Sequence, residues 1–359
     1  METEDTTPSY TRIDKLGEFG LIKKLTENIV LKQPSSIKGV GDDAAVIEPE
    51  KDHVMLFSTD MLAEGVHFDL TYTPLRHLGY KAVAVNVSDI CAMNGTPTQI
   101  TVSMGVSNQF SVEALEELYR GMQYACDEYG VDLVGGDTTS SNSGMIINIA
   151  ILGKAKKDHV TYRNTANIGD IICVSGDLGA AYSGFLVLNR GKEQFANDPE
   201  AKPDLTGYDY VLKRQLMPSA RVDIVEIFKT HNVIPTAMID ISDGLSSEVN
   251  HLCNPISPRM GSGAIGAIID EERLPINENT KKVAEEFKKS AISFALSGGE
   301  DYELLFTVSP KDFEKLKLSD KLKRIGEIVT PAQGVSFRDK TGILHPLSAK
   351  GWDGLKGEK

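Results

Sequence analysis

The chain has 359 residues, and 38 Lys and Arg residues against 51 Asp and Glu residues give a formal net charge of −13. This acidic balance disfavours proteins that wrap nucleic acid or bind an anionic membrane, because those partners are themselves negatively charged. No run approaches 18 apolar residues, so we expect no membrane helix, and the N-terminus lacks the apolar segment of a secretory signal. The four cysteines form no CxxC pair, so we expect neither a zinc knuckle nor a disulfide framework. We therefore expect a reduced, cytoplasmic protein.

The first half of the sequence predicts helices and strands in alternation. Apolar residues at helical spacing predict helices over 17–31, 75–93 and 111–129. Ser111 begins the third of these and is a residue type that caps helices. Apolar runs predict strands over 53–58, 99–106, 131–134 and 145–152. The polar, turn-rich stretch 154–169 then predicts a domain boundary.

The second half has the same mixed character. Apolar runs predict strands over 171–175, 237–241, 264–269, 292–296 and 302–308. Helices are predicted over 180–188, 220–229, 244–252 and 277–289. The polar stretch 193–207 is predicted to be an exposed insertion. We therefore expect an α/β (α+β) protein of two mixed domains, residues 1–156 and residues 157–359.

Carboxylates recur beside small residues where regular elements are predicted to end. Five of these clusters lie in or beside loops and one lies within a helix, and they occur at 41–43, 58–60, 88–89, 135–139, 240–244 and 297–301. Any single Asp among them could be only a turn former or a helix cap. Six such clusters in one chain are harder to explain in that way, although spacing alone does not show that they meet in space.

The clusters predict a particular chemistry if they converge. Backbone N–H groups in Gly-rich loops suit phosphate oxygens, whereas carboxylates repel phosphate. Both can share one cleft when cations lie between them, and Mg²⁺ takes oxygen ligands from carboxylates, water and substrate phosphates. The pattern therefore indicates several Mg²⁺ ions and a polyphosphate ligand. The sequence has neither a Walker phosphate loop nor the protein-kinase motifs.

Three other residues carry weaker signals. His67 follows Asp60 closely and could reach the same cleft, but a lone His is more often structural. Arg163 is a single basic residue in the linker, for which a solvated surface charge is the simpler interpretation. Trp352 is the only tryptophan, and an anchor for the C-terminal tail is its simpler interpretation.

The ordered set of motifs resembles the thiamine-monophosphate kinase family, in the superfamily of aminoimidazole ribonucleotide synthetase. The resemblance extends from about residue 17 to residue 352, and its motifs are GDDAA at 41–45, STD at 58–60, VNVSD at 85–89, GGDTT at 135–139, DISDGL at 240–245 and SGGEDYEL at 297–304. It implies ATP-dependent phosphorylation of thiamine monophosphate to thiamine diphosphate, a step of thiamine diphosphate biosynthesis. The attacking phosphate oxygen is already anionic, so no residue is expected to act as a general base.

The resemblance also implies roles for individual residues. The implied metal ligands are Asp43, Ser58, Thr59, Asp60, Asp89, Asp137, Asp240 and Asp243. The implied ATP contacts are Tyr119, Gly136, Asp137, Arg163 and Ser242. The implied contacts with thiamine monophosphate are His67, Glu300 and Trp352, since an acidic group and an aromatic face suit the cationic thiazolium ring.

The fold implied by the resemblance is an N-terminal ATP- and metal-binding domain and a larger C-terminal α/β domain. A homodimer is implied, formed through N-terminal strands that complete a β-barrel. Two alternatives stay open at this point. One is another ATP-dependent member of the superfamily, although selenophosphate synthetase is disfavoured because no Cys precedes Cys91. The other is a nucleotide-sensing regulatory protein with a degenerate kinase site.

Overall fold

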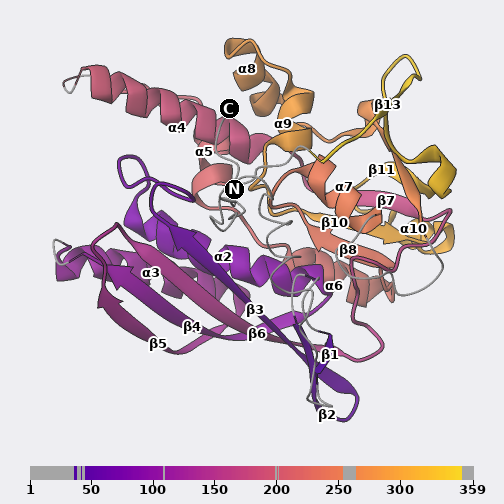
Figure 1. Ribbon diagram of the computed structural model, residues 1–359, viewed down its shortest axis with the longest axis horizontal. Coiled ribbons are helices and arrows are strands. Elements are labelled where there is room, and N and C mark those ends of the chain that lie inside the picture. Colours follow the sequence, from indigo (N-terminus) through magenta and orange to yellow (C-terminus); the bar gives the residue numbers. More distant parts are fainter. Residues whose placement is uncertain are drawn as a thin grey trace, which may run out of the picture.

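The computed structural model describes residues 36–38, 42, 45–107, 110–198, 200, 202–253 and 264–349. Their strands form two sheets, one in each half of the chain (Figure 1). The first sheet has six strands in the order β1-β2-β3-β6-β4-β5, of which only β4 and β5 are parallel neighbours. These strands are β1 (Ser36–Lys38), β2 (Ala45–Glu50), β3 (His53–Ala63), β4 (Thr96–Val106), β5 (Asp132–Ser140) and β6 (Ile146–Lys156).

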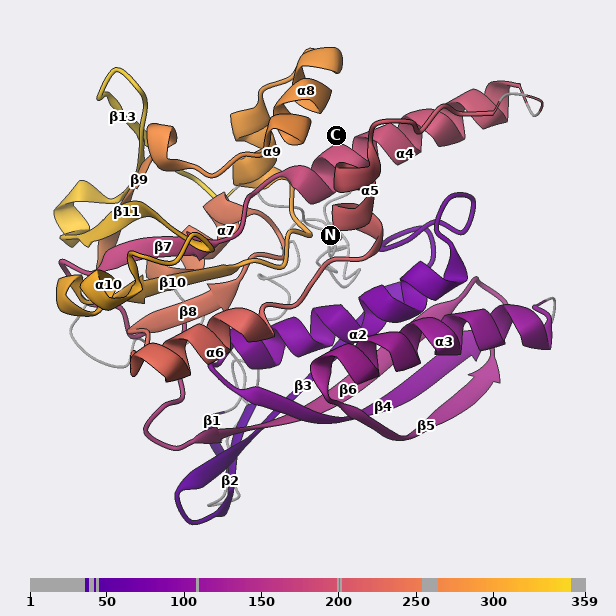
Figure 2. The ribbon, with the colours of Figure 1, turned by 180° about the vertical axis from the view of Figure 1, so that it is seen from behind.

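Two long helices cover one face of the first sheet. They are α2 (Leu75–Ala92) and α3 (Val112–Tyr129), and both ribbon views place them on the same side (Figures 1 and 2). No helix of the described residues covers the opposite face, where Phe57, Met61 and Val134 are exposed. Among the described residues, this sheet therefore leaves an apolar surface without a helix over it.

Helix α2 is buried on nearly all sides. Its sequence between Leu78 and Ala92 is mostly apolar on every side, and a helix that is hydrophobic all round is an interior helix. The exceptions are Lys81, Asn86, Ser88 and Asp89. It contacts β3 and β6 of the first sheet on one side and β8 of the second sheet on the other. One apolar core consequently runs from Leu56 of the first sheet to Phe306 of the second. Among the described residues, no helix combines the length and apolar character needed to span a bilayer.

The second sheet has seven strands in the order β13-β12-β9-β11-β7-β10-β8. Neighbours are antiparallel except β9 and β12. The strands are β7 (Ile171–Ser175), β8 (Ala237–Asp240), β9 (Gly266–Asp270), β10 (Leu304–Val308), β11 (Leu322–Val329), β12 (Val335–Arg338) and β13 (Leu344–Pro346).

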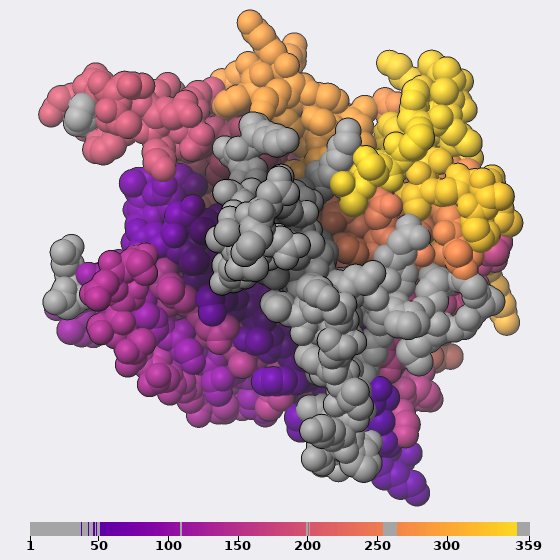
Figure 3. Space-filling view, in the orientation of Figure 1, coloured from indigo at the N-terminus to yellow at the C-terminus, as the bar shows by residue number. Residues whose placement is uncertain are grey.

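Helices cover the central strands of this sheet on both faces. The covering helices include α6 (Val222–His231) on one face and α7 (Leu245–Cys253) on the other. The other helices of this half are α4 (Ala180–Asn197), α5 (Asp209–Leu216), α8 (Glu278–Glu286), α9 (Ala291–Ser297) and α10 (Pro310–Leu316), and α8 packs against α4, α5 and α9. Successive residues of β10 enter different cores: Phe306 packs with Phe228 of α6, and Leu305 belongs to the cluster that contains Leu245 of α7. The space-filling view shows α4 projecting from the molecule at the upper left (Figure 3).

Most of the predicted elements are confirmed, and the differences have local causes. The helices predicted over 75–93 and 111–129 are α2 and α3, and the Ser111 hydroxyl accepts a hydrogen bond from the backbone of Ala114. The strand predicted over 292–296 is wrong. This segment is helix α9, because a short apolar run fits a buried helix as well as a buried strand. The helix predicted over 17–31 lies outside the described residues.

Two predicted loops are also wrong. The strands β3 and β5 continue through Ser58–Asp60 and Gly135–Thr139, where the sequence predicted that strands end. Helix α4 likewise extends to Asn197, into the stretch predicted to be an insertion. The prediction of a mixed α/β protein is confirmed, with one mixed sheet in residues 36–156 and the other in residues 171–346. The boundary at residue 156 stays a prediction, and the strands described for the first sheet do not close into a barrel.

Candidate active site

A cavity of about 1000 Å³ lies between the two halves of the chain. Its walls come from β3, α2, the loop after β3, helices α4 and α5, the turn after β8 and the turn before β10. The residues of the predicted site that line it are Asp60, His67, Asp89, Asp240, Ser242, Asp243 and Glu300. The cavity therefore brings together residues from motifs that are up to 240 positions apart in the sequence.

One end of the cavity is rich in carboxylates, and the VNVSD motif of α2 organises it. Asn86 accepts a hydrogen bond of 3.0 Å from the backbone N–H of Asp60, which ties β3 to the helix. Ser88 donates a bond of 2.6 Å to Asp240, at the end of β8. Asp89 accepts a bond of 2.5 Å from the Ser58 hydroxyl. A single turn of one buried helix thus positions carboxylates from both sheets.

Burial and mutual repulsion shape the electrostatics of this end. Burial raises the pKa of Asp240, while the Ser88 hydrogen bond and the charge of Arg163 act in the opposite direction. Burial and the neighbouring Asp243 raise the pKa of Glu248 well above its usual value. The pKa of Tyr302 is also raised well above its usual value, by burial and then by carboxylates that include Glu300 and Asp60. The cluster therefore carries a negative field that nearby side chains only partly neutralise.

These features fit a divalent cation held with the help of a substrate. The donors are oxygen atoms of carboxylates, which Mg²⁺ prefers, and the repulsion among them is what a cation would relieve. Glu248 accepts a hydrogen bond from the backbone of Asp243, and its second oxygen is buried without a partner in the described part of the chain. Within that part no three His, Cys, Asp or Glu side chains form a ready-made metal site. Mg²⁺ commonly takes only one or two carboxylates and completes its shell with water and phosphate.

His67 and Glu300 form a second group of residues in the cavity wall, and the charge of Glu300 acts on the pKa of His67. The carboxylate of Glu300 accepts bonds of 2.7 Å from Lys81 and 2.6 Å from Gln215. The Nδ1 atom of His67 accepts a bond of 3.1 Å from the backbone of Ala63, so the neutral ring carries its proton on Nε2. Burial lowers the pKa of His67, which favours this neutral form at pH 7.

The segment that carries Glu300 has an unusual backbone. Gly299, Glu300 and Tyr302 have φ values of 71°, 59° and 51°, in the left-handed region that disfavours most side chains. Two backbone bonds stabilise this conformation: Glu300 N–H donates to Ser242 at 2.7 Å, and Tyr302 N–H donates to Ile241 at 2.8 Å. The SGGEDYEL and DISDGL motifs are thus joined through their backbones.

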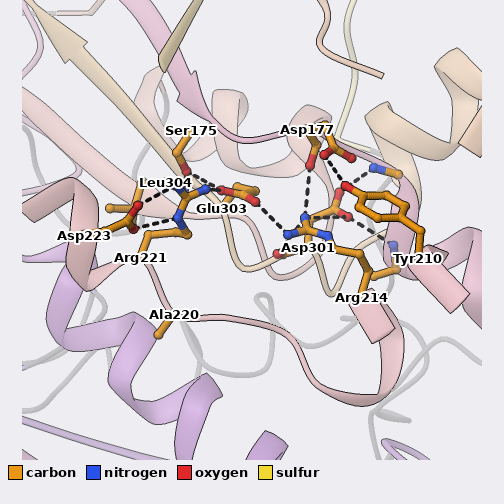
Figure 4. A network of polar contacts seen from close by, with 12 residues as sticks. Ser175, Asp177, Tyr210, Arg214, Ala220, Arg221, Asp223, Asp301, Glu303 and Leu304 are labelled. Atoms are coloured by element: carbon orange, nitrogen blue, oxygen red, sulfur yellow. Dashed lines mark hydrogen bonds and ion pairs between the residues drawn. The ribbon is translucent and has the colours of Figure 1, made fainter. Parts of the chain in front are cut away.

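A buried ionic network supports this segment from behind (Figure 4). Glu303 accepts bonds from Ser175, from Arg221 and, at 2.8 Å, from Arg214. Asp301 accepts a bond of 2.7 Å from the backbone of Gly179 at the start of α4. Asp301 and Glu303, the two neighbours of Tyr302, are therefore bonded to interior residues. These bonds keep Glu300 directed toward the cavity.

Other predicted site residues lie away from the lining of this cavity. The Thr59 hydroxyl lies on the opposite face of β3 from Asp60, where it donates to the backbone of Ile149. Tyr119 is exposed on α3, and Asp137 is exposed on β5. Gly136 is required by packing, because a Cβ atom there would lie 2.0 Å from the backbone oxygen of Val102.

The remaining predicted residues have different positions. Ser58 contacts the site through Asp89, as described above. Arg163 is buried, and its Nε atom lies 3.2 Å from Asp42, so the interpretation of a solvated surface charge is wrong. Asp43 and Trp352 lie outside the described residues.

Sequence reasoning missed Lys81, Gln215, Glu248 and Tyr302, of which all but Glu248 line the cavity. A signal existed for Lys81, because it is a charge within the apolar run of α2 and a buried lysine needs a partner. Gln215 carried no such signal, since its role depends on α5 lying beside α2.

Comparisons with known proteins are consistent with this geometry. The sequence profile of the AIR synthase related protein N-terminal domain matches residues 41–155. The thiamine-monophosphate kinase of Bacillus subtilis (strain 168) is 30% identical over 351 residues, which cover 95% of this chain and 100% of that protein. The enzyme of the same name from Aquifex aeolicus is 35% identical over 301 residues, covering 84% of this chain and 88% of the relative.

Solved structures show the same similarity. The structure described as AaThiL complexed with AMPPCP and TMP superimposes with a TM-score of 0.79 at 31% identity, over 96% of this chain and 99% of that one. The hydrogenase maturation protein HypE in complex with ATP has a TM-score of 0.66 at 19% identity, over 94% of this chain and 97% of that one, and shares the fold alone.

Proposed function

Because the chain belongs to the thiamine-monophosphate kinase family, we propose that it transfers the γ-phosphoryl group of ATP directly to the phosphate of thiamine monophosphate, giving thiamine diphosphate and ADP. One observation carries the proposal. Four carboxylates from three separate motifs line one cavity, and they are Asp60, Asp89, Asp240 and Asp243. A cavity with this lining suits phosphate groups only together with cations.

Two groups of residues have different roles in this proposal: one binds Mg²⁺ and ATP, and the other binds the thiamine portion. The carboxylate end, with Asp43 as a further expected ligand, holds several Mg²⁺ ions, which neutralise phosphate charge when bound. The accepting phosphate oxygen is anionic at neutral pH, so positioning of the two substrates is the main task of the protein. Ser242 and Arg163 are the ATP contacts that lie near this end. His67 and Glu300, together with Trp352, bind the thiamine portion.

We further propose that the chain forms a homodimer through the open face of the first sheet. This face exposes Phe57, Met61 and Val134, and burying apolar surface of this kind favours association. Strands of two such sheets could close the implied barrel, and β5 would bring Gly136 and Asp137 into the interface. Light scattering should give twice the chain mass, and Met61→Lys should shift the protein toward monomer.

The reaction itself is tested with purified protein, ATP and Mg²⁺. Thiamine monophosphate should be converted to thiamine diphosphate, whereas free thiamine should be a poor acceptor because it lacks the accepting phosphate. Initial rates should give intersecting double-reciprocal lines, as direct transfer in a ternary complex requires. A trapped phosphoprotein or parallel lines would contradict direct transfer, and comparable kcat/KM with thiamine would contradict the substrate assignment.

The metal ligands are tested by Asp→Asn changes, which preserve size and remove charge. Asp60→Asn, Asp89→Asn and Asp243→Asn should stay folded and lose most of kcat, with partial recovery at high Mg²⁺. Asp270→Asn is the control, because Asp270 pairs with Arg338 at 3.0 Å and is not among the residues that line the cavity. Asp42 is unsuitable as a control because it is buried against Arg163. Wild-type kcat in folded Asp89→Asn would remove that residue from the site.

A further inference from the structure

Glu300 is already paired with a cation of the protein itself. The Nζ atom of Lys81 lies 2.7 Å from its Oε1 atom, and only 3% of the Lys81 side chain is exposed, against 29% of the Glu300 side chain. Lys81 comes from α2 and Glu300 from the turn before β10, so the pair crosses from one half of the chain to the other. Because Lys81 is buried, separating this pair would leave its charge without a partner and largely without water. The two charges therefore largely cancel at the cavity wall.

The second oxygen of Glu300 is held by Gln215. The Gln215 Nε2 atom donates a bond of 2.6 Å to Oε2 of Glu300, and Gln215 is buried and lines the cavity. This bond fixes the orientation of the amide, because only the nitrogen can donate to a carboxylate. The Gln215 oxygen then has no hydrogen-bond partner within the described part of the chain. An acceptor left in this state is costly unless a bound ligand supplies an N–H group.

We propose that Lys81 and Gln215 are positioning residues that turn Glu300 into a neutralised hydrogen-bond acceptor, which recognises an amino group of the substrate rather than its positive charge. The proposal rests on the function proposed above. The relevant chemical class is an aromatic ring with an exocyclic –NH₂ group, such as the aminopyrimidine of thiamine monophosphate. Such a group has two N–H donors, and Glu300 and the Gln215 oxygen offer two acceptors.

This proposal and a simple counter-ion role for Glu300 predict opposite results. If Glu300 attracted the cationic ring through its charge, removing Lys81 would strengthen the attraction and lower KM. If Glu300 acts as an oriented acceptor, removing Lys81 leaves it without the partner that holds it, and KM rises. The sign of the change therefore separates the two roles without any need for its exact size.

The first experiment measures KM for each substrate in Lys81→Met, which keeps the length of the side chain and removes the charge. We expect KM for thiamine monophosphate to rise roughly 10- to 100-fold, since a hydrogen bond to a charged group is lost. The KM for ATP should stay within about twofold, a split that general loss of structure would not produce. Lys81→Arg should recover part of the loss. A lower or unchanged KM for thiamine monophosphate in Lys81→Met would overturn the proposal.

Two further variants test whether the effect of Lys81→Met comes only from impaired folding. Lys281→Met removes an exposed lysine that pairs with Glu278 on α8 and is not among the residues that line the cavity, and it should leave both KM values unchanged. Gln215→Met removes the other partner of Glu300 without creating a buried charge. It should also raise KM for thiamine monophosphate selectively, whereas a counter-ion role leaves that KM unchanged.

The second experiment uses the wild-type protein and needs no variant. The probe is the monophosphate of the 4-oxo analogue of thiamine, which keeps the cationic ring and the phosphate but replaces the amino group with a carbonyl. We expect kcat/KM to fall roughly 100-fold or more, because the acceptors of the site lose their donors. An analogue used as well as thiamine monophosphate would refute recognition of the amino group. If wild type fails to phosphorylate thiamine monophosphate itself, the proposed function falls, which is a distinct result.

Discussion

Ser88 of α2 donates a hydrogen bond of 2.6 Å to the Oδ2 atom of Asp240, although the two residues lie 152 positions apart. Both are buried, and the bond links the helix that covers the first sheet to a strand of the second. A carboxylate in such a position needs partners, since burial disfavours its charged form. The contact that joins the two halves of the chain therefore also positions one carboxylate of the cavity.

Ser88→Ala should impair both stability and metal use. Removing the hydroxyl leaves a buried carboxylate oxygen without its donor, which should cost about 1–3 kcal/mol of unfolding free energy. The activity should require more Mg²⁺, because protonated Asp240 is a poorer ligand. Urea unfolding and kcat against Mg²⁺ concentration measure the two effects. Ser183→Ala is the control, since that buried hydroxyl only bonds the carbonyl of Gly179 in its own helix, and equal losses in both variants would contradict the assignment.

Glu303→Gln should destabilise the protein strongly. Glu303 is buried between Arg214 and Arg221 and is the carboxylate that pairs with both of them (Figure 4). Its neutralisation leaves Arg221 with Asp223 and Arg214 with Asp301, at 3.8 Å, as the remaining ion pairs. Breaking a buried pair in this way costs about 3–5 kcal/mol. Glu327→Gln, which removes a half-exposed partner of Arg338 at 3.7 Å, should change stability by less than about 1 kcal/mol. Chemical unfolding of both variants tests the comparison, and a similar small loss in each would refute the role of the network.

Gly299→Ala should reduce activity more than its backbone strain alone explains. A Cβ atom at Gly299 would lie 2.7 Å from the backbone oxygen of Ser242, in the turn that also holds Glu300. Gly207→Ala is a matched control, because Gly207 also has a positive φ, of 84°, but no atom lies within 4 Å of the added Cβ. Each variant pays about 1 kcal/mol for the left-handed backbone. Only Gly299→Ala should lose kcat/KM for thiamine monophosphate, and equal kinetics in both would exclude the steric effect.

The stability of the protein should depend on His251 below neutral pH. Burial, followed by the charge of Arg163, lowers the pKa of His251 to about 4 from 6.5. As pH falls below 6.5, the unfolded chain takes up a proton that the folded chain refuses, so stability is lost between pH 6.5 and pH 4. Between pH 7.5 and pH 5 the loss from this group should be about 2 kcal/mol. His251→Gln should lose less stability over this interval by that amount, and parallel urea-unfolding profiles of wild type and variant would contradict it.

The local elements were largely predictable because their signals are local. Ser111 and the apolar spacing that follows it define the start of α3, and the apolar run from Leu78 defines α2. The segment 292–296 was mistaken for a strand because five mostly apolar residues do not distinguish a buried helix from a buried strand. The ends of β3 and β5 were misplaced because pairing with β6 and β4 extends them past residues that usually occur in turns.

The sequence alone determined which motifs are candidates for the chemistry, since Asp60, Asp89, Asp240 and Asp243 each stand in a short pattern that can be recognised without a structure. It also determined the family, through the order of these motifs. Only the tertiary structure decided that Lys81 neutralises Glu300, that Gln215 holds its second oxygen, and that the Thr59 hydroxyl faces away from the cavity. The first two contacts join α2, α5 and the turn before β10, and the third depends on which face of β3 carries Thr59. Such long-range pairings are set by how the two sheets pack around α2 rather than by any local sequence pattern.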